Sequence, residues 1–369
     1  MSTLWAPNLS TSINSGSLNV WLNANDAVDG YVLSGSDTIP DKDFGSNPII
    51  KQINNLGTLG GALTRLFPFN EEHSPQLMTG TFSSLNGFKF GYTGSAAPGT
   101  NNWKETRMSS TIMPPTGDSA RQIFLVGSQF FHGSGSRSTT NFKFLMSYGK
   151  KSIGKEFGIT IDGTGNSADR PNIDFFGQQF NASSALMSFP DPFGFGLIGY
   201  SSAGGTNGAT KLHFNGTTVG TETRTLDTQR GSGLFLGGLV VEGSADVSPS
   251  DYILHELLIY DVGDEGNDDA TGFKNIVEGY LAHKWGFSSE LPSDHPYKKS
   301  APPAIIYPTA ESTPPEQNFG PDYTINQFQN MSSQYRRFTQ IPFSKGLNGV
   351  PNLRKTETAY SASLGKTET

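Results

Sequence analysis

Short stretches of the chain alternate between hydrophobic and polar residues with a period of two. Leu18–Leu22, Phe88–Tyr92 and Phe142–Tyr148 are examples, and each places its large side chains on one face of an extended strand. Clusters of Gly, Ser, Asn and Asp separate such stretches, as turns between strands require. Similar strands are expected at 157–161, 211–214, 234–241 and 252–260. The pattern predicts an all-β fold in which two antiparallel sheets bury one face of each strand.

One segment, 269–285, follows the helical period instead. Its core-facing side chains recur at spacings of three and four residues: Phe273, Ile276, Val277, Tyr280, Leu281 and Lys284. Asp268 or Asp269 would cap the N-terminus of this helix, and Gly286 would close its C-terminus. We expect Tyr280, Leu281 and Trp285 to pack in the core, with the ammonium group of Lys284 reaching out to water.

Composition and charge narrow the class of protein. Of 369 residues, 34% are hydrophobic, 16% are charged and 44 are glycines, which suits a β protein with many loops. The net charge of −7 argues against nucleic-acid binding, and the absence of cysteine excludes disulfides, thiolate zinc sites and a cysteine nucleophile. The first ten residues lack a basic and then apolar pattern, and the apolar run 234–241 is far shorter than the ~20 residues that span a bilayer. We therefore expect neither a secretory signal nor membrane insertion.

The character of the chain changes after about residue 298. Six prolines fall between positions 302 and 321, and proline favours extended backbone without internal hydrogen bonds. Between 336 and 369, six basic residues outnumber two acidic ones, although the whole chain is acidic. We expect residues 1–298 to form the sandwich, and residues 299–369 to form a Pro-rich linker and a basic extended arm for assembly. The residues expected to bind a partner through this arm are Arg336, Arg337, Phe338, Phe343, Arg354, Lys355 and Tyr360.

Several motifs resemble those of a known family. The segments LHELLIYD (254–261), EGYLAHKWG (278–286) and LPSDHPY (291–297) follow one another closely. Two weaker matches, LNVWLNAND (18–26) and LNGFKF (85–90), lie near the N-terminus. Together they resemble the concanavalin A-like (LamG-type) lectin/glucanase sandwich domains of tailed-phage virion proteins and marine bacterial surface proteins.

The resemblance implies a two-sheet antiparallel jelly-roll sandwich with one C-terminal helix and an extended C-terminal arm. The usual role of such domains is to bind carbohydrate or another surface without catalysis. Two histidines fall in the matched motifs, and we interpret both His283 and His295 as makers of structural hydrogen bonds rather than functional groups.

No catalytic pattern is visible along the chain. Glucanases on this fold carry an E-x-D-x-x-E strand, because two carboxylates must flank the glycosidic bond. The closest strand, 252–260, holds only Glu256, and strict alternation would turn its neighbour His255 to the opposite face. A zinc-protease H-E-x-x-H motif is excluded because position 259 is Ile. We therefore predict that the protein is not an enzyme and has no cofactor or catalytic metal.

Two weaker binding hypotheses remain. The acidic loop could hold calcium at Asp261, Asp264 and Asp268, although its spacing is not that of an EF-hand and its acids also suit a helix N-terminus. A sugar would stack on loop aromatics. The candidates are Tyr92, Trp103, Phe131 and His132, each of which could equally be a core or rim residue.

These observations favour a phage virion structural protein located at the virion surface. It would be a capsid decoration or a tail or fibre component that displays a lectin-like domain and binds other virion proteins through its arm. Its outer partner would be a host surface glycan, and a homo-oligomer is compatible with this role. The alternative is a bacterial surface carbohydrate-binding or adhesive protein, either non-catalytic or, as a weaker variant, a glycoside hydrolase.

Overall fold

The computed structural model describes most of the chain up to residue 303 and little beyond it. The described residues are 7, 17–41, 45–65, 74–82, 85–93, 104–128, 143–161, 171–174, 179–181, 196–238, 252–262, 272–303, 360–361 and 363–364. The chain divides into two units, Met1–Tyr307 and Pro308–Thr369. In the second unit the described strands β19 (Tyr360–Ser361) and β20 (Ser363–Leu364) pair with each other. The expected boundary after residue 298 stays a prediction.

The strands of the first unit form two rows, and within each row neighbouring strands are hydrogen-bonded to each other. We call the first the helix row. Every neighbouring pair in it is antiparallel. Its order is β16 (Thr217–Arg224), β15 (Gly208–Phe214), β14 (Gly196–Ser202), β9 (Arg121–Ser128), β18 (Tyr252–Asp261), β6 (Leu85–Thr93) and β5 (Gln76–Phe82). The strand β1 (Ser17–Asn23) pairs with β18 beside β6, and β7 (Lys104–Thr106) pairs with β6.

We call the second row the open row, and it is also antiparallel throughout. Its order is β13 (Gln179–Asn181), β12 (Pro171–Asp174), β11 (Glu156–Ile161), β10 (Lys143–Gly149), β17 (Ser232–Leu236), β8 (Met108–Ser109), β4 (Ala62–Arg65), β3 (Gly45–Asn54) and β2 (Tyr31–Asp41). One pairing, between Ile49 in β3 and Gln76 in β5, joins the rows into a continuous sheet of 18 strands. The prediction of an all-β, antiparallel fold is confirmed, whereas its jelly-roll connectivity stays a prediction.

The main core lies between the two rows. In the open row, consecutive strand partners contribute one line of buried apolar side chains: Met108, Leu236, Met146, Ile159, Ile173 and Phe180. The rings of Phe157 in β11 and Tyr200 in β14 meet edge to face at 5.0 Å, and the Tyr252 hydroxyl donates to the Leu145 carbonyl at 2.5 Å. Because these contacts cross from row to row, hydrophobic burial and hydrogen bonds together hold the rows face to face.

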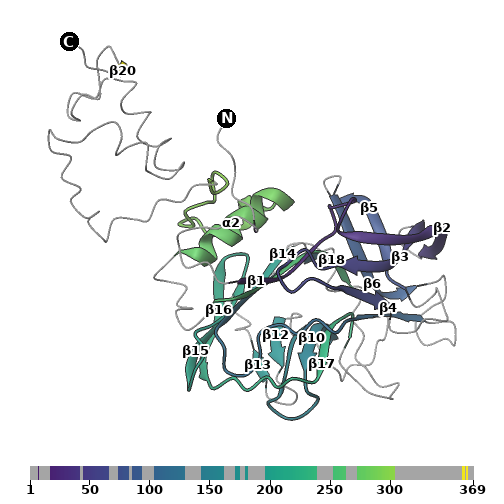
Figure 1. The fold of residues 1–369 in the computed structure, drawn as a ribbon, viewed down its shortest axis with the longest axis horizontal. Coiled ribbons are helices and arrows are strands. Elements are labelled where there is room, and N and C mark those ends of the chain that lie inside the picture. The colour runs from purple at the N-terminus through teal and green to yellow at the C-terminus, as the bar shows by residue number, and fades with distance from the viewer. Residues whose placement is uncertain are drawn as a thin grey trace. The chain divides into compact units, whose positions relative to one another are not determined.

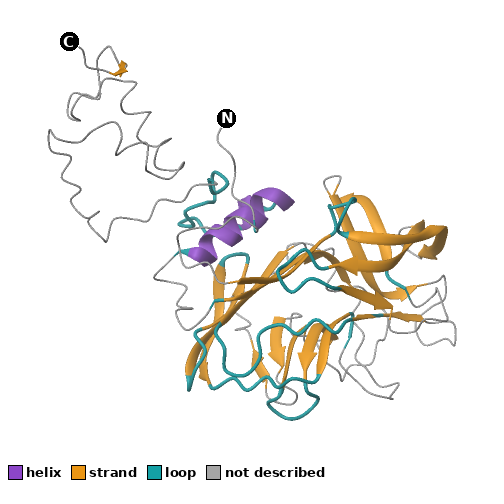
Figure 2. Cartoon of the chain, viewed as in Figure 1, coloured by secondary structure: helices purple, strands orange, loops and turns teal. Residues whose placement is uncertain are grey.

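A second core forms on the other face of the helix row. There the helix α2 (Phe273–Trp285) covers β9, β14 and β18, as Figures 1 and 2 show. All three strands are consequently buried along almost their whole length. The expectation that each strand buries only one face is wrong for these central strands, because the single helix excludes water from the second face.

The boundaries of α2 differ from the sequence prediction at one end. The helix begins at Phe273, four residues later than expected, and its N-cap is Gly272 in the left-handed conformation with no side-chain hydrogen bond. Asp268 and Asp269 lie outside the described residues and outside the helix. Gly286 closes the C-terminus at φ 80° as predicted, and its backbone N–H bonds to the Ala282 carbonyl.

After α2 the chain folds back along the helix. The short 3₁₀ helix η4 (Ser288–Glu290) follows, and Leu291 is buried against the second core. Tyr297 then lies directly on Gly279, where an added Cβ would come within 2.4 Å of the tyrosine Cβ. This segment therefore braces the outer side of α2. None of the helices in the described ranges has the length and apolar character needed to cross a bilayer.

Candidate functional site

Among the described residues of the first unit, polar side chains gather at several places, and two of them are compared first. One lies between the helix row and α2 around Glu256, and we call it the Glu256 cluster: Trp21, Glu256, Lys284 and Trp285. The other is the face of the open row that points away from the main core. The geometry of each decides whether it holds the fold together or is available to a ligand.

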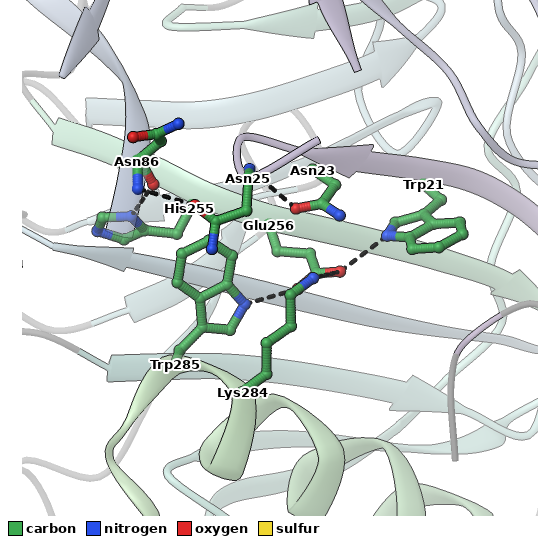
Figure 3. Close-up of polar contacts among 8 residues, drawn as sticks. All are labelled: Trp21, Asn23, Asn25, Asn86, His255, Glu256, Lys284 and Trp285. Carbon is green, nitrogen blue, oxygen red and sulfur yellow. Dashed lines mark hydrogen bonds and ion pairs between the residues drawn. The ribbon is translucent and has the colours of Figure 1, made fainter. Parts of the chain in front are cut away.

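The carboxylate of Glu256 is fully buried, yet it has several donors (Figure 3). Oε1 accepts from the indole N–H of Trp21 at 2.8 Å and from the Lys284 ammonium at 2.9 Å. Oε2 accepts from the indole N–H of Trp285 at 2.6 Å and from Lys284 at 2.8 Å. A buried carboxylate is tolerated only with such compensation, and here the donors come from β1 and α2.

A β-bulge places Glu256 where α2 can reach it. Against β9, the register of β18 shifts between Leu254, which faces Gly127, and Glu256, which faces Val126. The extra residue is His255, whose ring lies 5.1 Å from the Trp285 ring. The expectation that His255 and Glu256 point to opposite faces is therefore wrong, because a bulge breaks the two-residue period.

Lys284 joins the cluster instead of reaching into water. Its side chain is 19% exposed, and its ammonium lies 5.2 Å from the Trp285 ring centroid and 5.4 Å from that of Tyr280. The position in the last turn of α2 also suits a cation, because the helix dipole is negative there. The prediction of a solvated Lys284 is wrong, whereas the expected packing of Leu281 and Trp285 is confirmed.

The rim of the cluster is tied together through the backbone (Figure 3). The side-chain oxygen of Asn23 accepts the backbone N–H of Asn25 at 3.0 Å, and that of Asn25 accepts the N–H of Asn86 at 2.9 Å. Nδ1 of His255 donates to the Asn86 carbonyl at 2.8 Å, so Nε2 of the neutral ring accepts from the Ser128 hydroxyl at 2.8 Å. Burial lowers the pKa of His255 from 6.5 to about 4.

Further along α2, the two motif histidines make the structural contacts expected of them. Nε2 of His283 donates to the Tyr297 carbonyl at 2.8 Å, and Nδ1 of His295 accepts the Tyr297 N–H at 3.2 Å. The other nitrogen of His295 lies 3.6 Å from the buried carboxylate of Glu278, which also pairs with Lys274 at 2.7 Å. Burial raises the pKa of Glu278, but these two neighbours outweigh it and hold the pKa below its ordinary value.

These contacts assign the Glu256 cluster to structure. Both carboxylate oxygens are occupied by donors from the protein, and removing Lys284 would leave the buried carboxylate without its counter-charge. The cluster therefore fastens α2 to the helix row. A ligand site has to be sought elsewhere, on a face whose polar groups are open to solvent.

The outer face of the open row is such a face. Residues that face each other in antiparallel pairs share one side of a sheet, and the register follows a single path across all nine strands. We call this path the transverse line: Val32, Gln52, Thr64, Ser109, Phe235, Ser147, Gly158, Asp174 and Gln179. It lies beside the apolar core line but on the opposite face, because it is displaced from that line by one residue in each strand.

Burial changes along the transverse line. Ser147 is fully buried, Phe235, Ser109 and Gln52 are half-buried, and Val32 at the edge of the row is 42% exposed. The Gln52 amide donates to the Asn54 side-chain oxygen at 2.7 Å, and the Asn54 amide donates to the Asp29 carbonyl at 2.5 Å. Both amides on the exposed part of this face are thereby held in fixed orientations.

The covered end of the same face holds an unusual pair. At Gly158, an added Cβ would lie 2.6 Å from a ring carbon of Phe144, so the ring lies over the glycine. The partner of Phe144 across the strands is Thr160, which is fully buried. Among the described residues its hydroxyl has no hydrogen-bond partner. A buried hydroxyl normally has a partner, so Thr160 is an exception among the described residues.

The sequence-based candidates fall largely outside these places. Tyr92 lies in β6 opposite Glu105 of β7, away from the transverse line. Asp261 ends β18, and the described residues contain no group of acids and histidines able to hold a metal ion; the calcium hypothesis stays a prediction. Tyr360 lies in β19. The other candidates lie outside the described residues: Trp103, Phe131, His132, Asp264, Asp268, Arg336, Arg337, Phe338, Phe343, Arg354 and Lys355.

Sequence reasoning missed the transverse line. Its members come from nine separate strands, and only the pairing register brings them together. The alternation of β17 did place Phe235 opposite to Leu234 and Leu236, so an outward-facing phenylalanine was the one signal available. Phe235 shares the accessible part of this face with Val32, which is 42% exposed at the edge of the row.

No family model and no curated protein matches the chain. The match to an arabinofuranosidase complexed with arabinofuranosyl-α-1,2-xylobiose covers 73% of this chain and 59% of that protein, at 14% identity and a TM-score of 0.43. A second match is to domain 4 of a GH43 extracellular arabinanase from Geobacillus stearothermophilus, in complex with arabinotriose. It covers 69% of this chain and 100% of that domain, at 15% identity and a TM-score of 0.31. A third match, to the CBM40 of a Ruminococcus gnavus sialidase bound to sialyllactose, covers 42% of this chain and 82% of that protein, at 16% identity and a TM-score of 0.31.

The chain thus spans 59% of the length of the arabinofuranosidase that it matches, and the three proteins are carbohydrate-active or carbohydrate-binding. The likeness is distant and assigns no activity to this chain. Two of the three are glycoside hydrolases or parts of them, which contradicts the prediction that this protein is not an enzyme. That prediction relied on one missing strand motif, whereas two carboxylates can also converge from strands far apart in the sequence.

Replacing Glu256 by glutamine should destabilise the first unit by about 2–4 kcal/mol, because Lys284 then keeps a largely buried charge without its partner. Adding Lys284→Met should recover part of this loss. Urea unfolding of the two single variants and the double variant measures the coupling. Asp227→Asn, in the exposed ion pair with Lys155, is the control and should change stability little. A Glu256→Gln protein as stable as the parent would contradict the assigned role.

The lowered pKa of His255 predicts a specific pH dependence. Between pH about 6.5 and about 4 the unfolded chain binds a proton that the folded protein does not, so stability falls as the pH falls through this window. The full contribution of His255 to the free energy of unfolding is about 3 kcal/mol. His255→Gln should remove this part of the slope in unfolding curves measured from pH 7 to pH 4. An unchanged slope in the variant would show that other groups cause it.

Proposed function

We propose that the protein binds a neutral glycan chain along the transverse line of the open row. The observation that carries the proposal is the line itself, which sets the hydroxyls of Ser109 and Thr64 and the amide of Gln52 in a row beside half-buried Phe235. Sugars present hydroxyls to such groups and apolar C–H faces to aromatic rings. Eight of the nine residues of the line are uncharged, the exception being Asp174 towards its far end, and this composition favours a neutral ligand.

The dimensions favour an extended ligand. From Val32 to Phe235 the line crosses five strands, which at the usual strand spacing is about 19 Å. This length accommodates several monosaccharides, and the exposed edge at β2 lets a chain continue past the site. Such a face fits the jelly-roll, lectin-type sandwich that the sequence motifs resemble.

The test measures binding of the full-length protein to a glycan array and to insoluble polysaccharides, followed by an oligosaccharide series of whichever glycan binds. Phe235→Ala should weaken binding about three- to tenfold, because one aromatic contact contributes on the order of 1 kcal/mol. Gln52→Ala should weaken it through the loss of an oriented amide. Affinity should rise with chain length and level off once the line is covered.

Ile153→Ala is the matched control, because this residue is 66% exposed but lies in the turn between β10 and β11, outside the line. It should leave binding unchanged. Equal binding by the Phe235 and Ile153 variants would place the ligand elsewhere, and no binding to any neutral glycan would refute the proposal. A hydrolysis assay on each bound glycan runs beside these measurements.

Display of this face on a virion is a separate proposal that rests on the sequence alone. It depends on the proline-rich segment, of which only Pro302 and Pro303 are described, and on the basic residues of the arm, which lie outside the described residues. A protein shortened to residues 1–298 would then keep glycan binding and lose incorporation into particles. Incorporation of the shortened protein would exclude attachment through the arm.

A further inference from the structure

Three Asn–Gly pairs lie within the described residues, at 86–87, 207–208 and 215–216. In this dipeptide the glycine backbone nitrogen can attack the asparagine side-chain carbonyl, because no side chain on the glycine obstructs it. The reaction needs a side chain that is free to rotate and a backbone that can bring the two atoms together. The three pairs meet these needs very differently.

Of the three asparagines Asn207 meets these needs best, although the following Gly208 is buried at the start of β15, opposite Arg224. It is exposed in the turn between β14 and β15, at φ 55° in the left-handed region. Its backbone N–H bonds to the Thr225 hydroxyl at 2.8 Å. Gly208 has to remain glycine, because an added Cβ would lie 2.0 Å from the Gly204 carbonyl oxygen. The fold therefore keeps the reactive dipeptide in an accessible turn.

Asn215 has the same left-handed backbone conformation, at φ 47°, in the turn between β15 and β16. Its side chain, however, is buried, and its oxygen accepts the backbone N–H of Leu197 at 2.8 Å. Its own backbone N–H bonds to the Leu197 carbonyl at 2.9 Å. Rotation of this side chain would leave a buried donor without a partner, so Asn215 is a natural matched control.

Asn86 is protected in another way. It lies within the extended strand β6, where its backbone N–H bonds to the Asn25 side chain at 2.9 Å and its carbonyl accepts from His255 at 2.8 Å. Both backbone groups are thus held by the rim of the Glu256 cluster. The torsion that the cyclisation needs would break these bonds.

We propose that Asn207 is a site of spontaneous deamidation in the folded protein and that Asn86 and Asn215 are not. The backbone nitrogen of Gly208 forms a bond to the side-chain carbonyl carbon of Asn207, and ammonia leaves with a proton. The resulting succinimide is then opened by one water molecule to aspartate or isoaspartate. No oxidant, reductant or enzyme is needed. The product places a new negative charge in the turn between β14 and β15.

The experiment incubates the full-length protein at mildly alkaline pH in ¹⁸O-labelled water and maps the peptides by mass spectrometry. Asn207 should incorporate label at least about tenfold faster than Asn215 or Asn86, because each of these has to lose a hydrogen bond that the fold supplies. In urea the three rates should converge. Equal rates in the folded protein, or an unreactive Asn207, would overturn the proposal.

Asn207→Gly removes the amide while tolerating the positive φ, so this variant should fold and lose the fast phase alone. Persistence of the fast phase in the variant would assign it to another residue. If the variant does not fold, the comparison of Asn207 with Asn215 in the parent protein still decides the question, because both rates come from the same sample.

Discussion

The buried carboxylate of Glu256 is the constraint on which the rest of the first unit depends. It receives two indole N–H groups and an ammonium group, and these donors come from β1 and from the last turn of α2. A buried charge in this position needs its counter-charge and its hydrogen-bond donors, and both depend on where α2 lies. The helix can therefore dock on the helix row in one position, with the Trp285 ring against His255.

Docking of α2 makes the two rows unequal. The helix row loses its outer face to the second core, so β9, β14 and β18 are buried on both sides. The open row has no described helix over it, and Val32, Gln52 and Thr64 remain accessible on its outer face. The position of one helix thus decides which face of the strands is available to a ligand.

Departures from regular strand geometry account for several of the unusual side-chain positions in the first unit. The bulge at His255 turns two neighbouring side chains towards α2, and the glycine at 158 makes room for the Phe144 ring. The left-handed asparagines at 207 and 215 occupy equivalent turn conformations, but only one of them is shielded by a partner strand. In each case the local backbone conformation sets where a side chain can point, and the packing around it decides whether that side chain is buried or exposed.

The sequence by itself determined the all-β class, the positions of seven of the eighteen described strands of the first unit, the C-terminal end of α2 at Gly286 and the structural roles of His283 and His295. These features depend on periodicity and on contacts between residues close in the chain. Only the tertiary structure decided the ion pair of Lys284, the shared face of His255 and Glu256, and the transverse line from Val32 to Gln179. Each of these joins residues far apart in sequence, and strand register and burial, which set such contacts, leave no trace in local spacing.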